Sequence, residues 1–145
     1  MLQLEPSALR EADSVNAPPH LDPNGLHLPA TLYRLAKAFA NQTDGGANEV
    51  VVHPGVARRL AHLVEDVTGV EVDYNDVREL LTVVATGKDG TRHPARSLSD
   101  GTLRFLALVV MQMDPLSRGV ICLEEPENSI HPGRISAVVE LLQDI

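Results

Sequence analysis

The stretch SLSDGTLRFLALVVMQMDPLSRGVICLEEPENSIHP, from Ser97 to Pro132, joins a polar turn, two apolar runs and two adjacent glutamates. The first apolar run, from about Asp100 to Met113, is apolar on nearly all sides and predicts a helix that is buried on most sides. The second, from Gly119 to Leu123, is short and continuously apolar, as in a central strand covered on both faces. Together they indicate an α/β fold.

Two carboxylates, Glu124 and Glu125, close the predicted strand, and Pro126 ends it. This places them at the carboxyl end of a strand, where open α/β sheets bind ligands. On an extended strand they point to opposite sides, so one can help to hold Mg²⁺ while the other orients or deprotonates a water molecule. Taken alone, the pair favours the simpler interpretation of two solvated glutamates before a turn.

The polar turn carries Ser99 where a helix N-cap belongs, Asp100 in the first helical turn, and Gly101, which allows close approach to the backbone. A helix N-terminus with free N–H groups and a nearby hydroxyl is a ready anion site. The alternative is that Ser99 and Asp100 only cap the helix. The fixed charge of Asp100 favours this alternative, because it opposes a bound phosphate.

The remaining sequence predicts further elements. Residues 1–30 contain five prolines and the Asn24-Gly25 pair, and indicate an extended segment with turns. Apolar residues at helical spacing predict a helix over Ala30–Gln42 and a second over about Pro54–Thr68, with Gly69 as its C-cap. Glu79–Ala95 indicates a strand, a glycine-rich turn and a return strand. A last helix is expected from Pro132 or Gly133.

The formal net charge of −8 argues against a dedicated nucleic-acid or anionic-membrane module, since both need a basic face. No apolar stretch approaches the length of a membrane span, so no membrane partner is expected. The single cysteine, Cys122, cannot form an internal disulfide, and a reduced, cytoplasmic setting fits it best. The six histidines are scattered without the spacing of a zinc site.

The order and spacing of these motifs resemble the C-terminal half of ABC-type ATPases, within the AAA family branch related to recombination, SMC and overcoming-lysogenization-defect proteins. Leu98–Thr102 resembles the ABC signature motif, Val120–Glu125 resembles Walker B with its catalytic glutamate, and Glu127–Pro132 resembles the D-loop region. The resemblance is specific over Ser97–Ile145. It is weaker in LDPNGLHLPATLYRL, residues 21–35.

This resemblance implies an ATPase that binds ATP with Mg²⁺ and dimerises head to tail, or pairs with a complementary ATPase half. It implies three groups of site residues: a catalytic base and a metal residue, a turn that contacts the γ-phosphate of the partner subunit's ATP, and an interface segment. The catalytic base is Glu125 and the metal residue is Glu124. The turn consists of Ser99, Asp100, Gly101 and Thr102, and the interface segment contains Asn128 and His131. Glu124 and Asp100 depart from the usual pattern, which has Asp and Gly there.

The implied fold is a partial P-loop NTPase of the α/β class, an ABC-ATPase-like C-terminal lobe with a helical subdomain and part of a parallel sheet. Its P-loop portion is expected to be missing, because no G-x-x-x-x-G-K-S/T occurs in the sequence. We expect one partial ATPase domain over residues 1–145, with 1–95 as the extended segment, helices and hairpin, and 96–145 as the signature, Walker B and D-loop part. ATP hydrolysis would then belong to the intact protein, and the isolated chain would be an inactive fragment.

Two other functions stay open on the sequence. A truncated, non-catalytic module could pair with a full-length ATPase or another protein, as the absence of a P-loop motif suggests. A metal-dependent nuclease could use Glu124 and Glu125, although further acidic residues at useful spacing are lacking. Arg92 and Arg96, near the signature-like motif, leave a nucleic-acid contact of the full assembly open.

Overall fold

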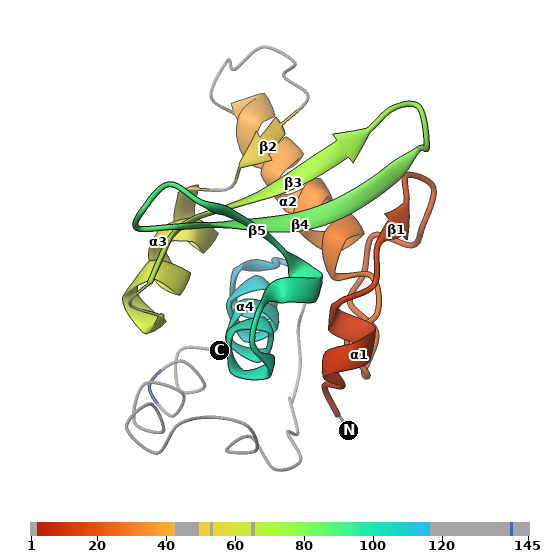
Figure 1. Ribbon diagram of the computed structural model, residues 1–145. Coiled ribbons are helices and arrows are strands. Elements are labelled where there is room, and N and C mark those ends of the chain that lie inside the picture. The colour runs from red at the N-terminus through yellow and green to blue at the C-terminus, as the bar shows by residue number, and fades with distance from the viewer. Residues whose placement is uncertain (1–2, 43–49, 53, 65, 117–139, 141–145) are drawn as a thin grey trace.

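The computed structural model describes residues 3–42, 50–52, 54–64, 66–116 and 140. Within them the chain forms one five-stranded sheet, drawn across the upper half of Figure 1. Its strand order is β1-β4-β3-β2, and β5 also pairs with β4. The strands are β1 (Asp13–Ser14), β2 (Val50–Val52), β3 (Val67–Asn75), β4 (Leu80–Gly87) and β5 (Arg92–Pro94).

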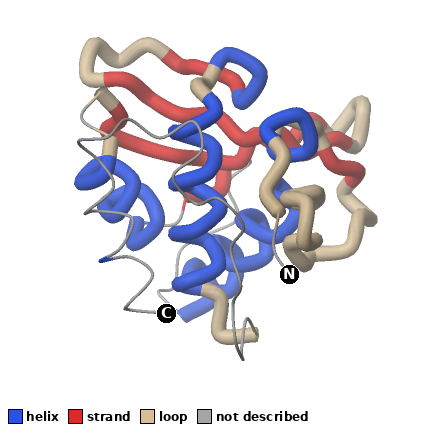
Figure 2. Tube along the Cα trace, turned by 90° about the horizontal axis from the view of Figure 1, so that it is seen from below, coloured by secondary structure: helices blue, strands red, loops and turns tan. Residues whose placement is uncertain are grey.

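The helices are α1 (Pro6–Leu9), α2 (Leu28–Gln42), α3 (Pro54–Leu63) and α4 (Asp100–Met113), and a short 3₁₀ turn (Ala95–Ser97) leads into α4. Figure 1 shows α4 below the sheet, with α3 on one side and α1 on the other. Seen from below in Figure 2, the helices lie against one side of the strands. α3 packs on β3, α2 packs on β4, and both α1 and α3 contact α4.

The sheet has one covered face because its two long strands alternate. Val70 and Val72 of β3, and Leu81, Val83 and Ala85 of β4, are buried. Glu71 and Thr82, which lie between them, are half-buried and Asp73 is exposed, although Val84 of β4 is also buried. This period of two is typical of an antiparallel sheet that packs a core on one side.

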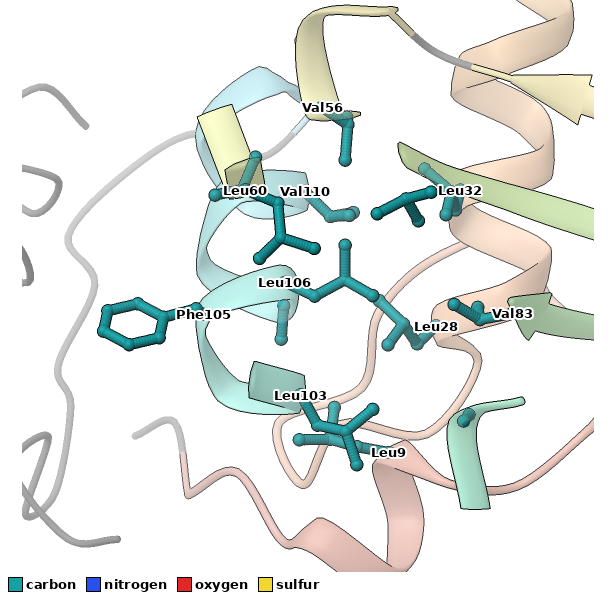
Figure 3. Close-up of a cluster of buried hydrophobic side chains, with 14 of the residues drawn as sticks. Leu9, Leu28, Leu32, Val56, Leu60, Val83, Leu103, Phe105, Leu106 and Val110 are labelled. Atoms are coloured by element: carbon teal, nitrogen blue, oxygen red, sulfur yellow. The ribbon is translucent and has the colours of Figure 1, made fainter. Parts of the chain in front are cut away.

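α4 supplies the centre of the core. Leu103 and the seven residues from Phe105 to Met111 are all buried, which confirms the helix expected to be buried on most sides. In Figure 3, Leu106 and Val110 lie with Leu28 and Leu60, while the side chain of Phe105, which is also buried, projects from the other side of α4. A helix covered on this many sides needs partners from several elements, and α1, α2 and α3 provide them.

Several expected elements are confirmed. The helix expected at Ala30–Gln42 is α2, which begins two residues earlier. The strand, turn and return strand expected between Glu79 and Ala95 are β4, its turn and β5. The extended segment expected over residues 1–30 contains the short α1 and β1, and β1 adds an antiparallel strand to β4.

The second helix is shorter than the sequence predicts. It ends at Leu63, and the chain enters β3 at Val67, so Thr68 is in a strand and Gly69 is no C-cap. Val67 satisfies the helical spacing of α3, but it is also the first buried residue of an alternating run. Pairing along β4 decides the outcome, with a β-bulge between Val67 and Gly69.

The expected part of a parallel sheet is not found in the described residues, where every strand pairing is antiparallel. Antiparallel pairing follows from the connections, because β3, β4 and β5 are joined by short turns rather than by crossover helices. The strand predicted at Gly119–Leu123 lies outside the described residues. The class is therefore a mixed α/β structure with an antiparallel sheet and helices.

Candidate functional site

The signature-like turn, which we define as Leu98–Thr102, opens α4. The Ser99 hydroxyl accepts a hydrogen bond from the backbone N–H of Thr102 at 3.1 Å and lies 2.8 Å from the Thr102 hydroxyl. The Ser99 carbonyl accepts the first backbone bond of the helix, from Leu103 N–H, at 3.1 Å. Ser99 is therefore the N-cap, as its position in the sequence predicts.

This capping leaves part of the helix N-terminus available. The first N–H groups of an α-helix have no acceptor within the helix, and here the caps satisfy those of Thr102 and Leu103. The N–H groups of Asp100 and Gly101 precede these, at the positive end of a 14-residue helix. Ser99 is exposed and Gly101 is half-buried, so a ligand can approach the turn. The arrangement suits a phosphate oxygen.

The charge of Asp100 is compensated from the far end of the sequence. Arg10, at the C-cap of α1, donates from Nη2 to Asp100 Oδ1 at 2.5 Å and to the Leu98 carbonyl at 2.8 Å. One guanidinium therefore contacts both the carboxylate and the backbone of the signature-like turn. The negative charge that opposes a phosphate at this position has a cationic partner.

α1 is held against α4 by packing and by backbone bonds. Leu9 is fully buried in the core cluster with Leu103, and Figure 3 shows the two side chains together at the lower end of α4. The N–H groups of Gln3 and Glu5 donate to the carbonyls of Pro23 and Asn24, both at 2.8 Å. These contacts fix the position from which Arg10 reaches the turn.

Gly25 closes this arrangement. Its φ of +99° is the left-handed conformation that favours glycine, and a Cβ there would lie 2.6 Å from Leu9 Cδ2. The tight approach of the 23–25 loop to Leu9 therefore requires glycine. The segment that carries Arg10 is fixed from both sides, by α4 and by this loop.

The opposite end of α4 carries a second arginine–carboxylate pair. Arg34 Nη2 lies 2.5 Å from Oδ2 of the buried C-cap residue Asp114. Its Nε donates to the Pro19 carbonyl at 2.9 Å. Both ends of α4 are thus joined by arginines to residues 1–42, while the apolar residues between them form the core.

The N-terminus of α2 uses a third carboxylate. Asp13 of β1 is 5% exposed, accepts Ala30 N–H at 2.9 Å and lies 3.0 Å from His27 Nδ1. His27 adopts a positive φ of 70°. A side chain from β1 therefore accepts an N–H of the first turn of α2, and this bond helps to position the helix that carries Arg34.

The structure brings together Ser99, Asp100, Gly101 and Thr102 in one turn, as the sequence predicts. The other predicted site residues, Glu124, Glu125, Asn128 and His131, lie outside the described residues, as does Cys122. Within the described part of the chain, no group of three or more His, Cys, Asp or Glu side chains could hold a metal ion. None of its helices is long and apolar enough to cross a membrane.

Arg10 and Arg34 were not singled out from the sequence. Each pairs with a carboxylate 80 or more positions away, so no local spacing reveals the contact. The sequence offers one signal, the aspartate at position 100 where the signature pattern has glycine. A carboxylate at a turn that binds phosphate requires a cation to neutralise it.

Comparison with known proteins gives one family and no closer relative. No curated protein and no solved structure matches the chain significantly. A family model described as "AAA domain, putative AbiEii toxin, Type IV TA system" matches residues 73–145, which is half of the chain and includes β4, α4 and the signature-like turn. The chain therefore belongs to this family of AAA domains, a family of nucleotide-binding, ATPase-type P-loop domains.

Proposed function

We propose that this chain is the signature and Walker B half of an ABC-type ATPase, which dimerises head to tail around ATP and Mg²⁺. The observation that carries the proposal is that the family match and the ordered motifs fall on the same residues. The family match covers 73–145, and the ordered motifs, the signature-like turn and the Glu124–Glu125 pair, both fall inside it.

In this proposal the signature-like turn serves the nucleotide of the partner subunit. The Ser99 hydroxyl and the N–H groups of Asp100 and Gly101 bind the γ-phosphate, with support from the helix dipole. Thr102 contributes by holding the Ser99 hydroxyl at 2.8 Å. Because the turn touches only the far side of the triphosphate, it becomes a complete site when two subunits meet.

The acidic pair serves the nucleotide of its own subunit. Glu124 would take the Walker B position and would help to hold Mg²⁺; its side chain is one methylene longer than aspartate, which a water-mediated contact would tolerate. Glu125 accepts a proton from the water that attacks the γ-phosphate. Asn128 and His131 follow in the segment that would run along the dimer interface near the two nucleotides.

The test is ATP hydrolysis by the native assembly, purified through a tag on this chain so that any P-loop-bearing partner is retained. Glu125→Gln should lower kcat by roughly a hundredfold or more, the usual loss when a general base is removed. Glu140→Gln, which changes an exposed glutamate of the same region, should leave the rate unchanged. An assembly that hydrolyses ATP equally well with Glu125→Gln would disprove the assignment of the base.

A second candidate function is a non-catalytic interaction module, favoured by the lack of a G-x-x-x-x-G-K-S/T motif in these residues. The same experiment separates the two. A module would be recovered with its partner, and the assembly's ATPase rate would not respond to Glu124 or Glu125. On either account the isolated 145-residue chain binds Mg-ATP more weakly than micromolar, because a P-loop supplies most phosphate contacts; calorimetry on the purified chain measures this directly.

A further inference from the structure

The signature-like turn carries the carboxylate of Asp100 at the place where, in the proposed function, the turn binds a phosphate. Asp100 is 44% exposed at the side chain and follows the capping serine directly. An uncompensated negative charge there would repel a phosphate oxygen at the Gly101 N–H. The proposed phosphate contact therefore depends on what neutralises Asp100.

Arg10 is placed to do this. Its side chain is only 28% exposed, and its Nη2 lies within hydrogen-bonding distance of Asp100 Oδ1 (2.5 Å) and of the Leu98 carbonyl (2.8 Å). The first contact holds the carboxylate against a cation, and the second fixes the backbone immediately before the Ser99 cap. Leu9, the residue before Arg10, is buried in the core cluster. The backbone that carries the Arg10 side chain is therefore held in place.

We propose that Arg10 is the positioning residue of the signature-like turn: it neutralises Asp100 and holds the Leu98 carbonyl, so that Ser99 and Gly101 can bind a nucleotide phosphate. The proposal rests on the proposed function. It adds a residue that lies outside the matched family region and explains how a signature-like motif with aspartate in place of glycine can still receive a phosphate.

The test is a titration of the isotope-labelled 145-residue chain with Mg-ATP at low ionic strength, following the NMR amide signals of Gly101 and Thr102. The wild-type chain should bind at this turn with a dissociation constant on the order of millimolar. Arg10→Gln should weaken binding about tenfold, because the uncompensated Asp100 then repels the phosphate. Arg10→Gln combined with Asp100→Asn should restore binding to within about threefold, since no charge remains to be compensated.

Arg34→Gln is the matched control, because it removes the arginine of the ion pair at the other end of the same helix. It should lower the thermal midpoint without changing the dissociation constant at the turn. Equal binding by the wild type and Arg10→Gln would overturn the role of Arg10 while leaving the phosphate contact intact. Equal weakening by Arg34→Gln would also overturn it, since helix stability alone would then explain the loss. No response of the wild-type turn to Mg-ATP would overturn the phosphate contact itself, and the role of Arg10 with it.

Discussion

Asp13 shows how much a single side chain can fix. It is 5% exposed and satisfies both the Ala30 N–H and His27 Nδ1. Asp13→Ala would leave both groups without this acceptor, and we expect the free energy of unfolding to fall by about 2 kcal/mol. Urea denaturation measures the change. The exposed Glu11→Ala should cost less than about 0.5 kcal/mol, and an Asp13 variant no worse than this control would contradict the capping role.

Ser99 combines a structural role with a proposed functional one, and two substitutions separate them. Ser99→Ala removes the cap of α4 and should cost about 1 kcal/mol of stability. Ser99→Asp keeps a capping oxygen and should leave the thermal midpoint near that of the wild type, while its charge opposes a phosphate. If thermal denaturation shows equal losses for both variants, the hydroxyl is not acting as the cap.

Asp89, in the turn between β4 and β5, is a titration probe of the hairpin. The backbone N–H of Thr91 and then its side chain hydrogen-bond the carboxylate and hold the pKa of Asp89 below its ordinary value of 3.8, with a smaller contribution from the charge of His93. Because the pKa of Asp89 is lower in the native state than in the unfolded state, the ionised carboxylate stabilises the fold at pH values above the unfolded pKa. This stabilisation is lost as the pH falls through the native pKa. Carboxyl NMR should show a midpoint below 3.8. Thr91→Val should raise it, and an unchanged midpoint would exclude the side-chain bond.

At the scale of elements, α4 is the centre of stability. Leu106 is fully buried in the cluster that also holds residues of α2, α3 and the sheet. Leu106→Ala should therefore lower the free energy of unfolding by about 2–5 kcal/mol, from lost burial and the cavity left behind. Val77, 90% exposed between β3 and β4, provides the control, since Val77→Ala should change stability by less than about 0.5 kcal/mol. Chemical denaturation of both variants measures the two changes in the free energy of unfolding. If burial causes the loss, only Leu106→Ala shows the large decrease.

α4 could be predicted residue for residue because its local signals agree: a serine cap, an uninterrupted apolar run and Pro115 just beyond its end. β3 could not be, because Val67 fits both a helical and an alternating pattern and its pairing partner, β4, begins several residues later. Propensity is a weak guide where tertiary pairing decides. Elements with one consistent period are predictable, and boundaries between two periods are not.

The candidate site also has one part that the sequence predicts and one part that it does not. The capping geometry of Ser99 and Thr102 follows from four consecutive residues and was predictable. The neutralisation of Asp100 by Arg10 spans 90 positions, and only the folded chain reveals it. Contacts that set the electrostatics of a site are the ones that sequence spacing does not encode.

At the scale of the molecule, the described fold joins two parts of the chain. α4 lies inside the matched region 73–145. Its first residue, Asp100, forms an ion pair with Arg10, and its C-cap residue, Asp114, forms an ion pair with Arg34. Leu9, Leu28 and Leu32 belong to the same core cluster as Leu103 and Leu106. The position of the signature-like turn is therefore set in part by residues that lie outside the family region, Arg10 among them through its contacts with Asp100 and the Leu98 carbonyl.

The most direct test of the central claim, that the signature-like turn and the acidic pair act on nucleotides of different subunits, is ATP hydrolysis by mixed variants. Ser99→Asp and Glu125→Gln assemblies should each be nearly inactive. Mixed and allowed to exchange subunits, they should recover about one quarter of the wild-type rate, because about half of the dimers are then mixed and each mixed dimer has one intact site of two. A mixture that exchanges subunits yet stays as inactive as its components would contradict the account.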